Sequence, residues 1–430
     1  MLDIKLFREN PDAVRESERK RFRDIAKVNQ VIDLDNRWRD KKKEIDSLKS
    51  ERNTLTVEIG KLKKAKKSAS ETEKLQKRVV EIKNLVETGE QEAEELLKQR
   101  DEVRYSIGNL LHGSVPVGQH EDANGVIRTW GDPREFGFEP RAHADLVEFL
   151  DVAVIGKAAE VSGSRTYYLK GDLVFLNLAL VQFAMDYLVQ KCGFIPFWTP
   201  YFLRREVIRG AAELSDFEET LYHDPREDIF FIATSEQSLA ALHWNEIIEA
   251  DKLPLRYAGF SACFRREAGA HGRDTKGIFR VHQFDKIEQF VFCKPDESWT
   301  IHEDIIKNAE ALFQKLEIPH RVVSIASGEL NDNAAKKYDI EAWFPAQETY
   351  REVVSCSNCT DYQARKLNIR VGRAGAEKEV LHTLNSTAIA TERAICAILE
   401  NNQEEDGTVK LPKVLYPYLG GRTEIRPKSA

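Results

Sequence analysis

The amino-acid sequence predicts an α+β protein in which a long N-terminal helical hairpin precedes a domain built on a mostly antiparallel sheet. Two observations carry this prediction. Apolar residues recur with alternating three- and four-residue spacing over about 34–110, which is typical of paired helices. Further along the chain, short runs rich in β-branched and aromatic residues are interspersed with helical patterns, which is typical of a sheet flanked by helices.

The N-terminal segment contains two apolar seams with the spacing of an antiparallel coiled coil. Between the seams, Ser70 and Glu73 are three positions apart and fit a capping box. At a rise of about 1.5 Å per residue, two helices of about 33 residues would form an arm of roughly 50 Å. The seam positions are Leu34, Trp38, Ile45, Leu48, Leu55, Ile59 and Leu62, then Leu75, Val79, Ile82, Val86, Ala93, Leu96, Val103, Ile107 and Leu110.

The first helix of this arm is basic, although the chain as a whole has a formal net charge of −7. Residues 39–67 contain 11 Lys and Arg against 5 Asp and Glu, a balance of +6. A local basic stripe suits a polyanion such as a nucleic acid. The same heptads also suit a dimerisation coiled coil, and the spacing alone does not separate these two interpretations.

Gly and Pro cluster between about His112 and Pro140, and this composition marks a domain boundary. We predict one domain over residues 1–112, which includes the arm at about 34–110, and a second over residues 113–430. In the second domain Leu173–Cys192 and Ala390–Asn401 are predicted helices. The predicted strands include DIFFIATSEQ, HRVVSIA, TYREVVSCS and EVLHTLNSTAIA.

Composition also restricts where the protein works. No run approaches about 18 consecutive apolar residues, so we expect no membrane span and no membrane partner. The N-terminus does not resemble a secretory signal, and the six scattered cysteines fit a reducing compartment, so we expect a cytoplasmic protein.

The stretch FSACFRREAGAHGRDTKGIFRVHQFDKIEQFVFC carries the most chemical information. Strand side chains alternate between two faces, so Arg280, Phe284 and Glu288 would share one face, and Arg265 would lie beside Glu267. Guanidinium groups suit phosphates, an aromatic face suits a nucleobase, and a carboxylate suits an ammonium group. An exposed hairpin with ordinary surface charge would look similar, but the set favours a site for a nucleotide and a small amine, such as ATP and an amino acid.

Three segments resemble the signature motifs of class II aminoacyl-tRNA synthetases. GFIPFWTPYFLRREV, with Pro200, resembles motif 1, which forms the dimer interface. FRREAG followed by FRVHQFDKIEQF resembles motif 2, and LNSTAIATERAICAILENNQ, with Arg393, resembles motif 3. With ATSEQ and EVVSCSNCTDYQARK, the chain is most similar to the seryl-tRNA synthetases in their eukaryotic-cytosolic style. Its N-terminal hairpin resembles the tRNA-binding arm of that family, and the resemblance covers nearly the whole chain.

The resemblance implies a class II catalytic domain that activates L-serine with ATP to seryl-adenylate and transfers the seryl group to tRNA(Ser). Where tRNA(Sec) exists, it is also an expected substrate. The resemblance further implies Mg²⁺ as a cofactor and a homodimer in which the arm of one subunit holds tRNA for the active site of the other.

The resemblance also implies the site residues. The catalytic residues are Arg265, which would grip the α-phosphate, and Arg393, which would hold the outer phosphates together with Arg280. The residues for ATP are Arg265, Arg266, Glu267, Arg280, Val281, His282, Gln283, Phe284, Glu352, Val353, Val354, Ser355 and Arg393. The residues for serine are Thr234, Ser235, Glu236, Arg265, Glu288, Asn385 and Thr387.

Within this set, Phe284 would stack on adenine, Glu288 would bind the serine ammonium group, and Thr387 would hydrogen-bond the serine hydroxyl. Glu352 and Ser355 would coordinate Mg²⁺, a hard cation that takes oxygen ligands. A regular strand places positions 352 and 355 on opposite faces, so this last role requires a bulge or a bend.

Two other functions fit parts of the sequence: an enzyme that makes the adenylate but loads a carrier other than tRNA, and a catalytically inactive tRNA-binding protein. The basic arm argues against the first, and the presence of Arg265, Glu288 and Arg393 argues against the second.

Nearby Cys and His residues receive no chemical role. Cys356 and Cys359 form a C-x-x-C, but no second pair supplies the other ligands of a structural zinc site, so we interpret them as packing residues. His271 and His282 are not assigned as general bases, because the serine carboxylate that attacks ATP is already ionised.

Overall fold

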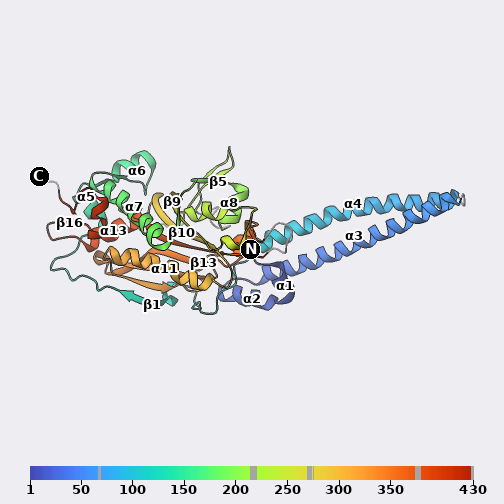
Figure 1. Ribbon diagram of the computed structural model, residues 1–430, viewed down its shortest axis with the longest axis horizontal. Coiled ribbons are helices and arrows are strands. Elements are labelled where there is room, and N and C mark those ends of the chain that lie inside the picture. The colour runs from blue at the N-terminus through green and yellow to red at the C-terminus, as the bar shows by residue number, and fades with distance from the viewer. Residues whose placement is uncertain (66–68, 214–219, 269–273, 275, 373–378, 428–430) are drawn as a thin grey trace. The chain divides into compact units, whose positions relative to one another are not determined.

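The computed structural model describes residues 1–65, 69–213, 220–268, 274, 276–372 and 379–427. The chain divides into two compact units (Figure 1). Leu2–Arg19 and Arg23–Gly108 form a helical unit, and Met1, Lys20–Phe22 and Asn109–Ala430 form a mixed α and β unit, which we call the core unit.

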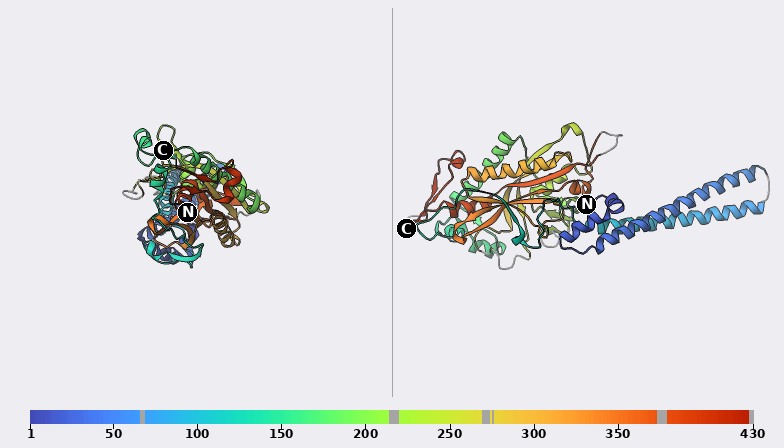
Figure 2. Two further views of the ribbon diagram at one scale, coloured as in Figure 1. Left: turned by 90° about the vertical axis from the view of Figure 1, so that its left-hand side faces the viewer. Right: turned by 90° about the horizontal axis from the view of Figure 1, so that it is seen from below.

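The helical unit contains α1 (Ile4–Glu9), α2 (Pro11–Lys20), α3 (Ala26–Lys64) and α4 (Ala69–Tyr105). Figures 1 and 2 show α3 and α4 running side by side as a hairpin, which we call the arm. The predicted hairpin is confirmed, but its helices have 39 and 37 residues, so they are longer than expected. The predicted capping box is wrong, because α4 begins before Ser70.

The apolar seam of the arm has two interruptions with physical explanations. Ile45, Ile82 and Val86 are buried along the seam, and at Gly89 an added Cβ would lie 3.1 Å from Cγ1 of Ile45. Glycine therefore makes room for a large neighbour. Arg100 is buried on the same seam because its Nη1 lies 2.8 Å from Oδ1 of the buried Asp35.

Part of the basic charge of α3 is paired within the arm. Lys41 contacts Glu92 at 2.9 Å, and Lys49 contacts Glu90 at 2.7 Å. Exposed pairs of this kind contribute at most about 1 kcal/mol to stability. They also mean that the local excess of +6 counted along residues 39–67 overstates the charge that the arm presents to a partner.

The core unit is built on an eight-stranded sheet with the order β1-β11-β12-β13-β15-β10-β9-β4. All neighbours are antiparallel except β4 and β9, which are parallel. The strands are β1 (Gly125–Trp130), β4 (Ile195–Trp198), β9 (Leu255–Phe264), β10 (Gln283–Cys293), β11 (His320–Ser324), β12 (Lys336–Phe344), β13 (Thr349–Asn358) and β15 (His382–Ala390).

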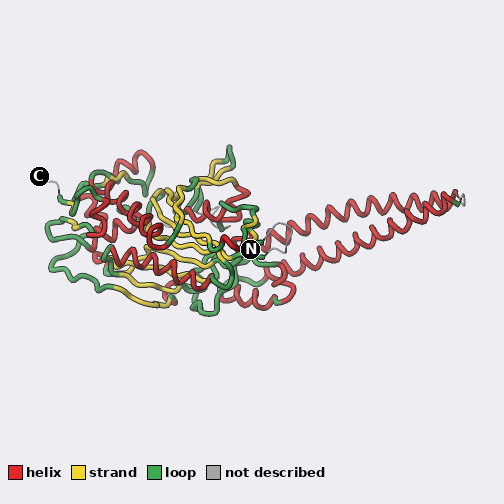
Figure 3. Tube along the Cα trace, in the orientation of Figure 1, coloured by secondary structure: helices red, strands yellow, loops and turns green. Residues whose placement is uncertain are grey.

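Helices and short strands surround this sheet (Figure 3). The helices are α5 (His143–Phe149), α6 (Gly156–Ser162), α7 (Asp172–Cys192), α8 (Arg205–Ala211), α10 (Ser235–Ala241), α11 (Ser298–Lys315), α12 (Tyr362–Lys366) and α13 (Thr391–Asn401). The small sheets are β5 (Phe202–Arg204) with β7 (Ile229–Phe231) and β6 (His223–Asp224), β2 (Ala153–Val154) with β3 (Tyr168–Leu169), β8 (Ile247–Ile248) with β14 (Arg370–Val371), and β16 (Val409–Lys410) with β17 (Glu424–Ile425).

Alternation along β10 separates the main core from the side of the sheet that bears polar groups. Ile287 and Val291 point into the large core that contains α7, α11 and α13. Phe290 and Phe292 point the other way, into a smaller core with α10 and α12. Since side chains two positions apart share a face, Glu288 lies on the same side of the sheet as Phe290.

Several sequence predictions for this unit need correction. DIFFIATSEQ is a strand only at β7, because Ser235 begins α10 and Thr234 caps it by accepting a hydrogen bond from the Glu236 N–H at 3.2 Å. The segment predicted as a domain boundary contributes β1 to the sheet. The helices predicted from Leu173 and from Ala390 are confirmed as α7 and α13.

Helix α7 also bears on the expectation about membranes. Among the described residues it is the one helix that is long and apolar enough to cross a membrane, by length and composition alone. One side of it, including Leu173, Leu176 and Leu180, is buried in the main core, as is usual for a core helix.

Candidate active site

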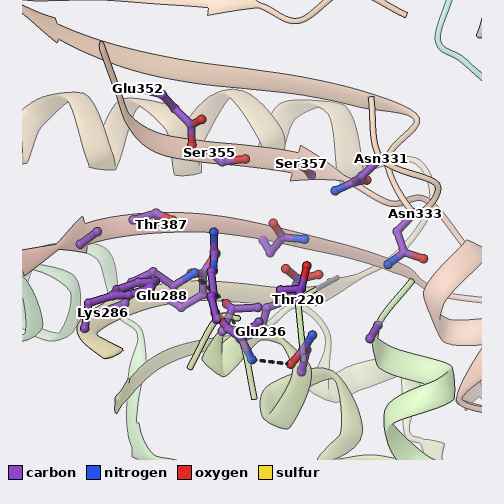
Figure 4. Close-up of a pocket in the computed structure, with 18 of the residues that line it drawn as sticks. Thr220, Glu236, Lys286, Glu288, Asn331, Asn333, Glu352, Ser355, Ser357 and Thr387 are labelled. Carbon is purple, nitrogen blue, oxygen red and sulfur yellow. Dashed lines mark hydrogen bonds and ion pairs between the residues drawn. The ribbon is translucent and has the colours of Figure 1, made fainter. Parts of the chain in front are cut away.

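A pocket of about 260 Å³ opens on the polar side of the sheet and brings together most of the predicted site residues. We call it the active-site pocket. Figure 4 shows Glu352, Ser355 and Ser357 along one strand and Thr387 on the neighbouring strand, with Glu288 beside it. The predicted residues that line the pocket are Thr234, Glu236, Arg265, Phe284, Glu288, Glu352, Val353, Ser355, Asn385, Thr387 and Arg393.

Other predicted ATP residues lie around this pocket. Arg280 lines an adjoining cavity of about 310 Å³ that shares Glu352 and Arg393 with it. Glu267 holds Arg280, with 2.8 Å between its Oε2 and the arginine Nε. Arg266 is exposed and lines a different pocket.

The remaining predicted residues do not line the active-site pocket with their side chains. Val281 and Val354 are buried in hydrophobic clusters, and the side chain of Gln283 is exposed. Ser235 is fully buried and donates a hydrogen bond to the Gly259 carbonyl at 3.2 Å. His282 places its Nδ1 2.8 Å from the Arg265 carbonyl, which fastens the two sides of the hairpin together.

The strand argument for Arg265, Glu267 and Arg280 is wrong in detail. β9 ends at Phe264 and β10 begins at Gln283, so all three residues lie in the connecting loop. The Arg265 N–H still donates to the His282 carbonyl at 2.8 Å, which carries the hairpin one residue further. The guanidinium carbon of Arg265 then lies 5.3 Å from the ring centre of Phe284, so the side chains predicted to contact phosphate and base are adjacent.

A β-bulge brings Glu352 and Ser355 to the same pocket. Ile340 on β12 faces Val354, and Glu341 faces Glu352, so Val353 is an extra residue on β13. One extra residue resets the alternation of side chains. The bulge that the sequence required but did not reveal is therefore present.

A second bulge aligns the residues predicted to hold serine. On β10 and β15, Ile287 faces Ile389 and Glu288 faces Thr387, which leaves Ala388 as the extra residue. The Glu288 carboxyl and the Thr387 hydroxyl therefore face the same pocket from neighbouring strands.

Glu288 is the most deeply buried acid in the pocket, with an exposure of 2%. Its Oε2 lies 2.5 Å from Nζ of Lys286. Lys286 also donates to Oγ1 of Thr234 at 2.7 Å, and the Thr234 hydroxyl lies 3.5 Å from Glu288. Burial raises the pKa of Glu288, and the lysine opposes this effect.

Arg393 and Glu352 form the charged edge of the pocket. Nη1 of Arg393 donates to the Glu352 carbonyl at 2.9 Å and lies 3.3 Å from its Oε1. Although the surrounding protein disfavours the charged form, Arg393 is the leading cation that holds the pKa of Glu352 below its usual range. The Glu352 carboxylate is therefore ionised beside the place predicted for the triphosphate.

Sequence reasoning missed three charged residues that line the pocket, Glu213, Lys286 and Glu392. Lys286 alternates with Phe284 and Glu288, so the same period of two would have found it. Glu392 precedes Arg393 and is 3% exposed, and its Oε2 has no hydrogen-bond partner in the described structure. Burial raises the pKa of Glu392 to about 7, and no sequence signal distinguished it from an ordinary acid in the first turn of a helix.

The cysteines near the pocket pack as expected. Asn385 places its Nδ2 3.6 Å from the sulfur of Cys359, and burial raises the pKa of both Cys356 and Cys359. Among the described residues, no group of three or more His, Cys, Asp or Glu side chains is arranged to hold a metal. His271 lies outside the described residues.

The geometry suits a phosphorylated nucleotide beside an amino acid. Arg265 and Arg393 supply fixed cations for phosphates, and Phe284 supplies an aromatic face. Glu288 and Thr387 supply an acceptor for an ammonium group and a partner for a hydroxyl. A carboxylate at 352 and a hydroxyl at 355 are hard oxygen donors, so these residues fit Mg²⁺, which keeps several waters of its own.

Two protein-family profiles match the chain. The profile described as the seryl-tRNA synthetase N-terminal domain matches residues 1–111. The profile described as the tRNA synthetase class II core domain (G, H, P, S and T) matches residues 217–402.

Full-length similarities agree with the profiles. A serine–tRNA ligase of Methanosphaera stadtmanae is 53% identical over 429 residues and covers 100% of both chains. The crystal structure of seryl-tRNA synthetase from Pyrococcus horikoshii complexed with ATP has a TM-score of 0.96 at 49% identity, covering 100% of both chains. The cytoplasmic serine–tRNA ligase of Naegleria fowleri in complex with AMP has a TM-score of 0.91 at 42% identity, covering 100% of this chain and 99% of that one. The chain therefore belongs to the seryl-tRNA synthetase family, the serine–tRNA ligases of class II.

Proposed function

We propose that this chain activates L-serine with ATP and passes the seryl group to tRNA(Ser), and to tRNA(Sec) where that tRNA exists. The observation that carries the proposal is one pocket lined by Arg265, Phe284, Glu288 and Arg393, in a chain of this family. The P. horikoshii relative complexed with ATP supports the choice of nucleotide.

In the first step, a serine carboxylate oxygen attacks the α-phosphorus of ATP, and pyrophosphate leaves. Arg265 neutralises the charge that develops on the α-phosphate, and Arg393 holds the outer phosphates together with Arg280. Phe284 stacks on adenine next to Arg265. Catalysis of this kind rests on positioning and electrostatic stabilisation, because the attacking carboxylate is already charged.

The remaining residues predicted for ATP mainly position other side chains and the backbone around the nucleotide. Glu267 orients Arg280 through their ion pair, and His282 fastens the hairpin behind Arg265. Val281, Gln283, Val353 and Val354 contribute backbone and wall contacts to the nucleotide region, and Arg266 contributes through its backbone alone.

Serine is held between two neighbouring strands. Glu288 accepts the ammonium group, and Thr387 hydrogen-bonds the serine hydroxyl. Thr234 and Glu236 close the pocket from α10, Ser235 fixes that helix on β9, and Asn385 lines the far end. When a site hydrogen-bonds a substrate hydroxyl, a substrate without it leaves buried polar groups unpaired.

Glu352 and Ser355 would hold Mg²⁺, which neutralises phosphate charge when it is bound. Glu352 is suited to this, because Arg393 favours its ionised form. The Val353 bulge lets the carboxylate and the hydroxyl reach the same side of β13.

The helical unit is proposed to bind tRNA. We assign residues 1–112 to a tRNA-binding domain and residues 113–430 to the catalytic domain. A long hairpin with exposed lysines reaches the outer body of a tRNA by shape and by phosphate contacts. The match of residues 1–111 to the family's N-terminal domain supports this assignment.

We also propose a cytoplasmic homodimer that associates through motif 1, with each arm serving the active site of the other subunit. Support comes from large apolar side chains left exposed on α7 and β4: Leu178 (58%), Ile195 (52%) and Trp198 (76%). A partner of the same chain would bury them. The cytoplasmic N. fowleri relative supports the compartment.

Two assays test the activity together. Serine-dependent exchange of labelled pyrophosphate into ATP reports the first step, and charging of tRNA reports the second. Exchange without charging would indicate a carrier other than tRNA. tRNA binding without exchange would indicate an inactive binding protein, and either result would overturn the proposal.

A further inference from the structure

A second opening lies beside the active-site pocket, on the small sheet formed by β5, β7 and β6. It has a volume of about 360 Å³ and is lined by Arg205, Leu221, Tyr222, His223, Phe230 and Arg266. We call it the outer pocket. Apart from Arg266, which we assigned above to the ATP region, none of its lining residues has a role in binding serine, ATP or Mg²⁺.

The outer pocket and the active-site pocket share their dividing wall. Thr220 lines the active-site pocket, whereas Leu221 and Tyr222 line the outer pocket. On the facing segment, Arg265 lines the first and Arg266 the second. The Arg266 N–H donates to the Thr220 carbonyl at 2.8 Å, so a backbone hydrogen bond joins the two segments of the wall. Figure 4 shows Thr220 at the lower side of the active-site pocket.

The lining of the outer pocket combines aromatic rings with cations. The His223 ring stacks on Phe230 with 4.2 Å between centroids and 19° between planes. The guanidinium carbon of Arg205 lies 4.8 Å from the centre of the Phe230 ring. Tyr222 packs against the His282 ring at 6.2 Å between centroids and is still 37% exposed, so part of it is open to a ligand. Stacking faces beside guanidinium groups are the usual means of holding an unpaired nucleotide.

The charges in this pocket limit what phosphate binding can contribute. Asp228 lies 2.7 Å from Arg205 and 3.0 Å from Nε2 of His223, so the Arg205 charge is already balanced. Binding there depends on stacking more than on net charge, which is the pattern expected for a base rather than for a run of phosphates.

The proposed second step brings a polynucleotide end to this place. The terminal ribose of tRNA must reach the acyl group inside the active-site pocket, so the preceding nucleotide lies just outside it. We propose that the outer pocket binds the penultimate unpaired nucleotide of the tRNA, with the base against Tyr222 and its phosphate toward Arg266. This inference rests on the proposed function and adds a binding site for the tRNA end.

The first test compares Tyr222→Ala with the natural chain in exchange and in charging. Serine-dependent exchange should be unchanged, because Tyr222 lines the outer pocket and not the active-site pocket. The charging efficiency, kcat/KM for tRNA, should fall roughly tenfold, as expected when one base-stacking interaction is removed. Tyr168→Ala, which removes another exposed tyrosine of the core unit, is the matched control and should leave both assays unchanged.

The second test identifies the nucleotide. A tRNA that lacks only the penultimate base should be charged roughly tenfold less well by the natural chain. With Tyr222→Ala, removal of that base should cause little further decrease, because both changes remove the same interaction.

A Tyr222→Ala variant that charges tRNA normally would overturn the inference. So would independent effects, in which Tyr222→Ala and removal of the penultimate base together lower charging by the product of their separate decreases. The proposed function stands in both cases. The inference would also be overturned if Tyr222→Ala lowered pyrophosphate exchange as much as it lowers charging, since the outer pocket would then act on the first step. A natural chain that exchanges but charges no tRNA would instead remove the proposed second step, and this inference with it.

Discussion

Lys286 and Glu288 form a buried ion pair inside the active-site pocket, with 2.5 Å between Nζ and Oε2. The two residues are 6% and 2% exposed, so neither charge is solvated by bulk water. Burial raises the pKa of Glu288, and Lys286 is the leading group that opposes the rise. The lysine therefore favours the ionised form of the carboxylate that we propose for the serine ammonium group.

Lys286→Met should raise the KM for serine by at least about tenfold near pH 7. Without the lysine, the pKa of Glu288 rises further and more of the carboxyl is protonated. The defect should therefore diminish as the pH rises. Glu288→Gln is the matched control, because its defect should persist at every pH. Pyrophosphate exchange from pH 6 to 9 gives the measurement, and parallel profiles for Lys286→Met and the natural chain would contradict this role.

Arg393→Ala should lower serine-dependent exchange by roughly 10²-fold or more, as expected when a fixed charge that stabilises the transition state is removed. The assembly state should not change, which sedimentation can verify. Arg134→Ala, which removes an exposed guanidinium paired with Glu404, is a suitable control. A folded Arg393→Ala variant with nearly natural exchange would show that the residue has no catalytic role.

Serine should be preferred over alanine by roughly 10⁴-fold or more in exchange. Alanine would leave the buried Thr387 hydroxyl without its partner, whereas threonine is excluded by its additional methyl group. Activation of alanine within about tenfold of serine would indicate an apolar pocket instead.

Glu392 should make stability depend on pH. Burial raises the pKa of its carboxyl to about 7 from an ordinary value of 4.5. Between these values the folded protein binds the proton and the unfolded chain does not, so this residue lowers stability as the pH rises from about 4.5 to 7. Glu392→Gln should remove this destabilisation, which is about 3 kcal/mol.

Thermal unfolding of both chains at pH 5 and pH 8 gives the comparison. The variant and the natural chain should have similar midpoints at pH 5, and the variant should be the more stable at pH 8. The pKa of Asp339 is also raised to about 7 by burial, so any pH dependence that remains in the variant should diminish with Asp339→Asn. An unchanged difference between the two chains across this range would contradict the burial argument.

Local patterns in the sequence predicted the arm, and together with the family resemblance they predicted 11 of the 23 residues that line the active-site pocket. Heptads identified α3 and α4, and alternation in β10 identified Phe284 and Glu288. The assumption that side chains alternate between the two faces of a strand failed where the backbone is irregular. The extra residues Val353 and Ala388 change which side chains face the pocket, and no residue type marks such positions.

Two further errors have related physical causes. TSEQ was assigned to a strand because apolar residues precede it, but Thr234 caps a helix with its hydroxyl, and the chain turns there. Arg265 and Arg280 reach the site from a loop rather than from strands, since the hairpin opens after Phe264. In both cases tertiary contacts determine where the strand ends, and a single sequence does not show those contacts.

We propose that the two units act in different steps: the core unit makes seryl-adenylate, and the arm holds the tRNA. All residues proposed for adenylate formation lie at or beyond Thr234, whereas residues 40–99 lie entirely in α3 and α4 and the segment that joins them. Some arm lysines are paired with carboxylates, so we expect the arm to neutralise only a few phosphates.

The most direct measurement is therefore exchange and charging by a chain in which a short turn replaces residues 40–99. Exchange should persist, because the active-site pocket and the motif 1 surface are intact. Charging should fall sharply, and the salt dependence of tRNA binding should flatten by roughly 0.7–0.9 log unit for each phosphate that the shortened chain no longer neutralises. If the shortened chain charges tRNA as efficiently as the natural one, the arm does not hold the tRNA, and a coiled coil for dimerisation becomes the better explanation.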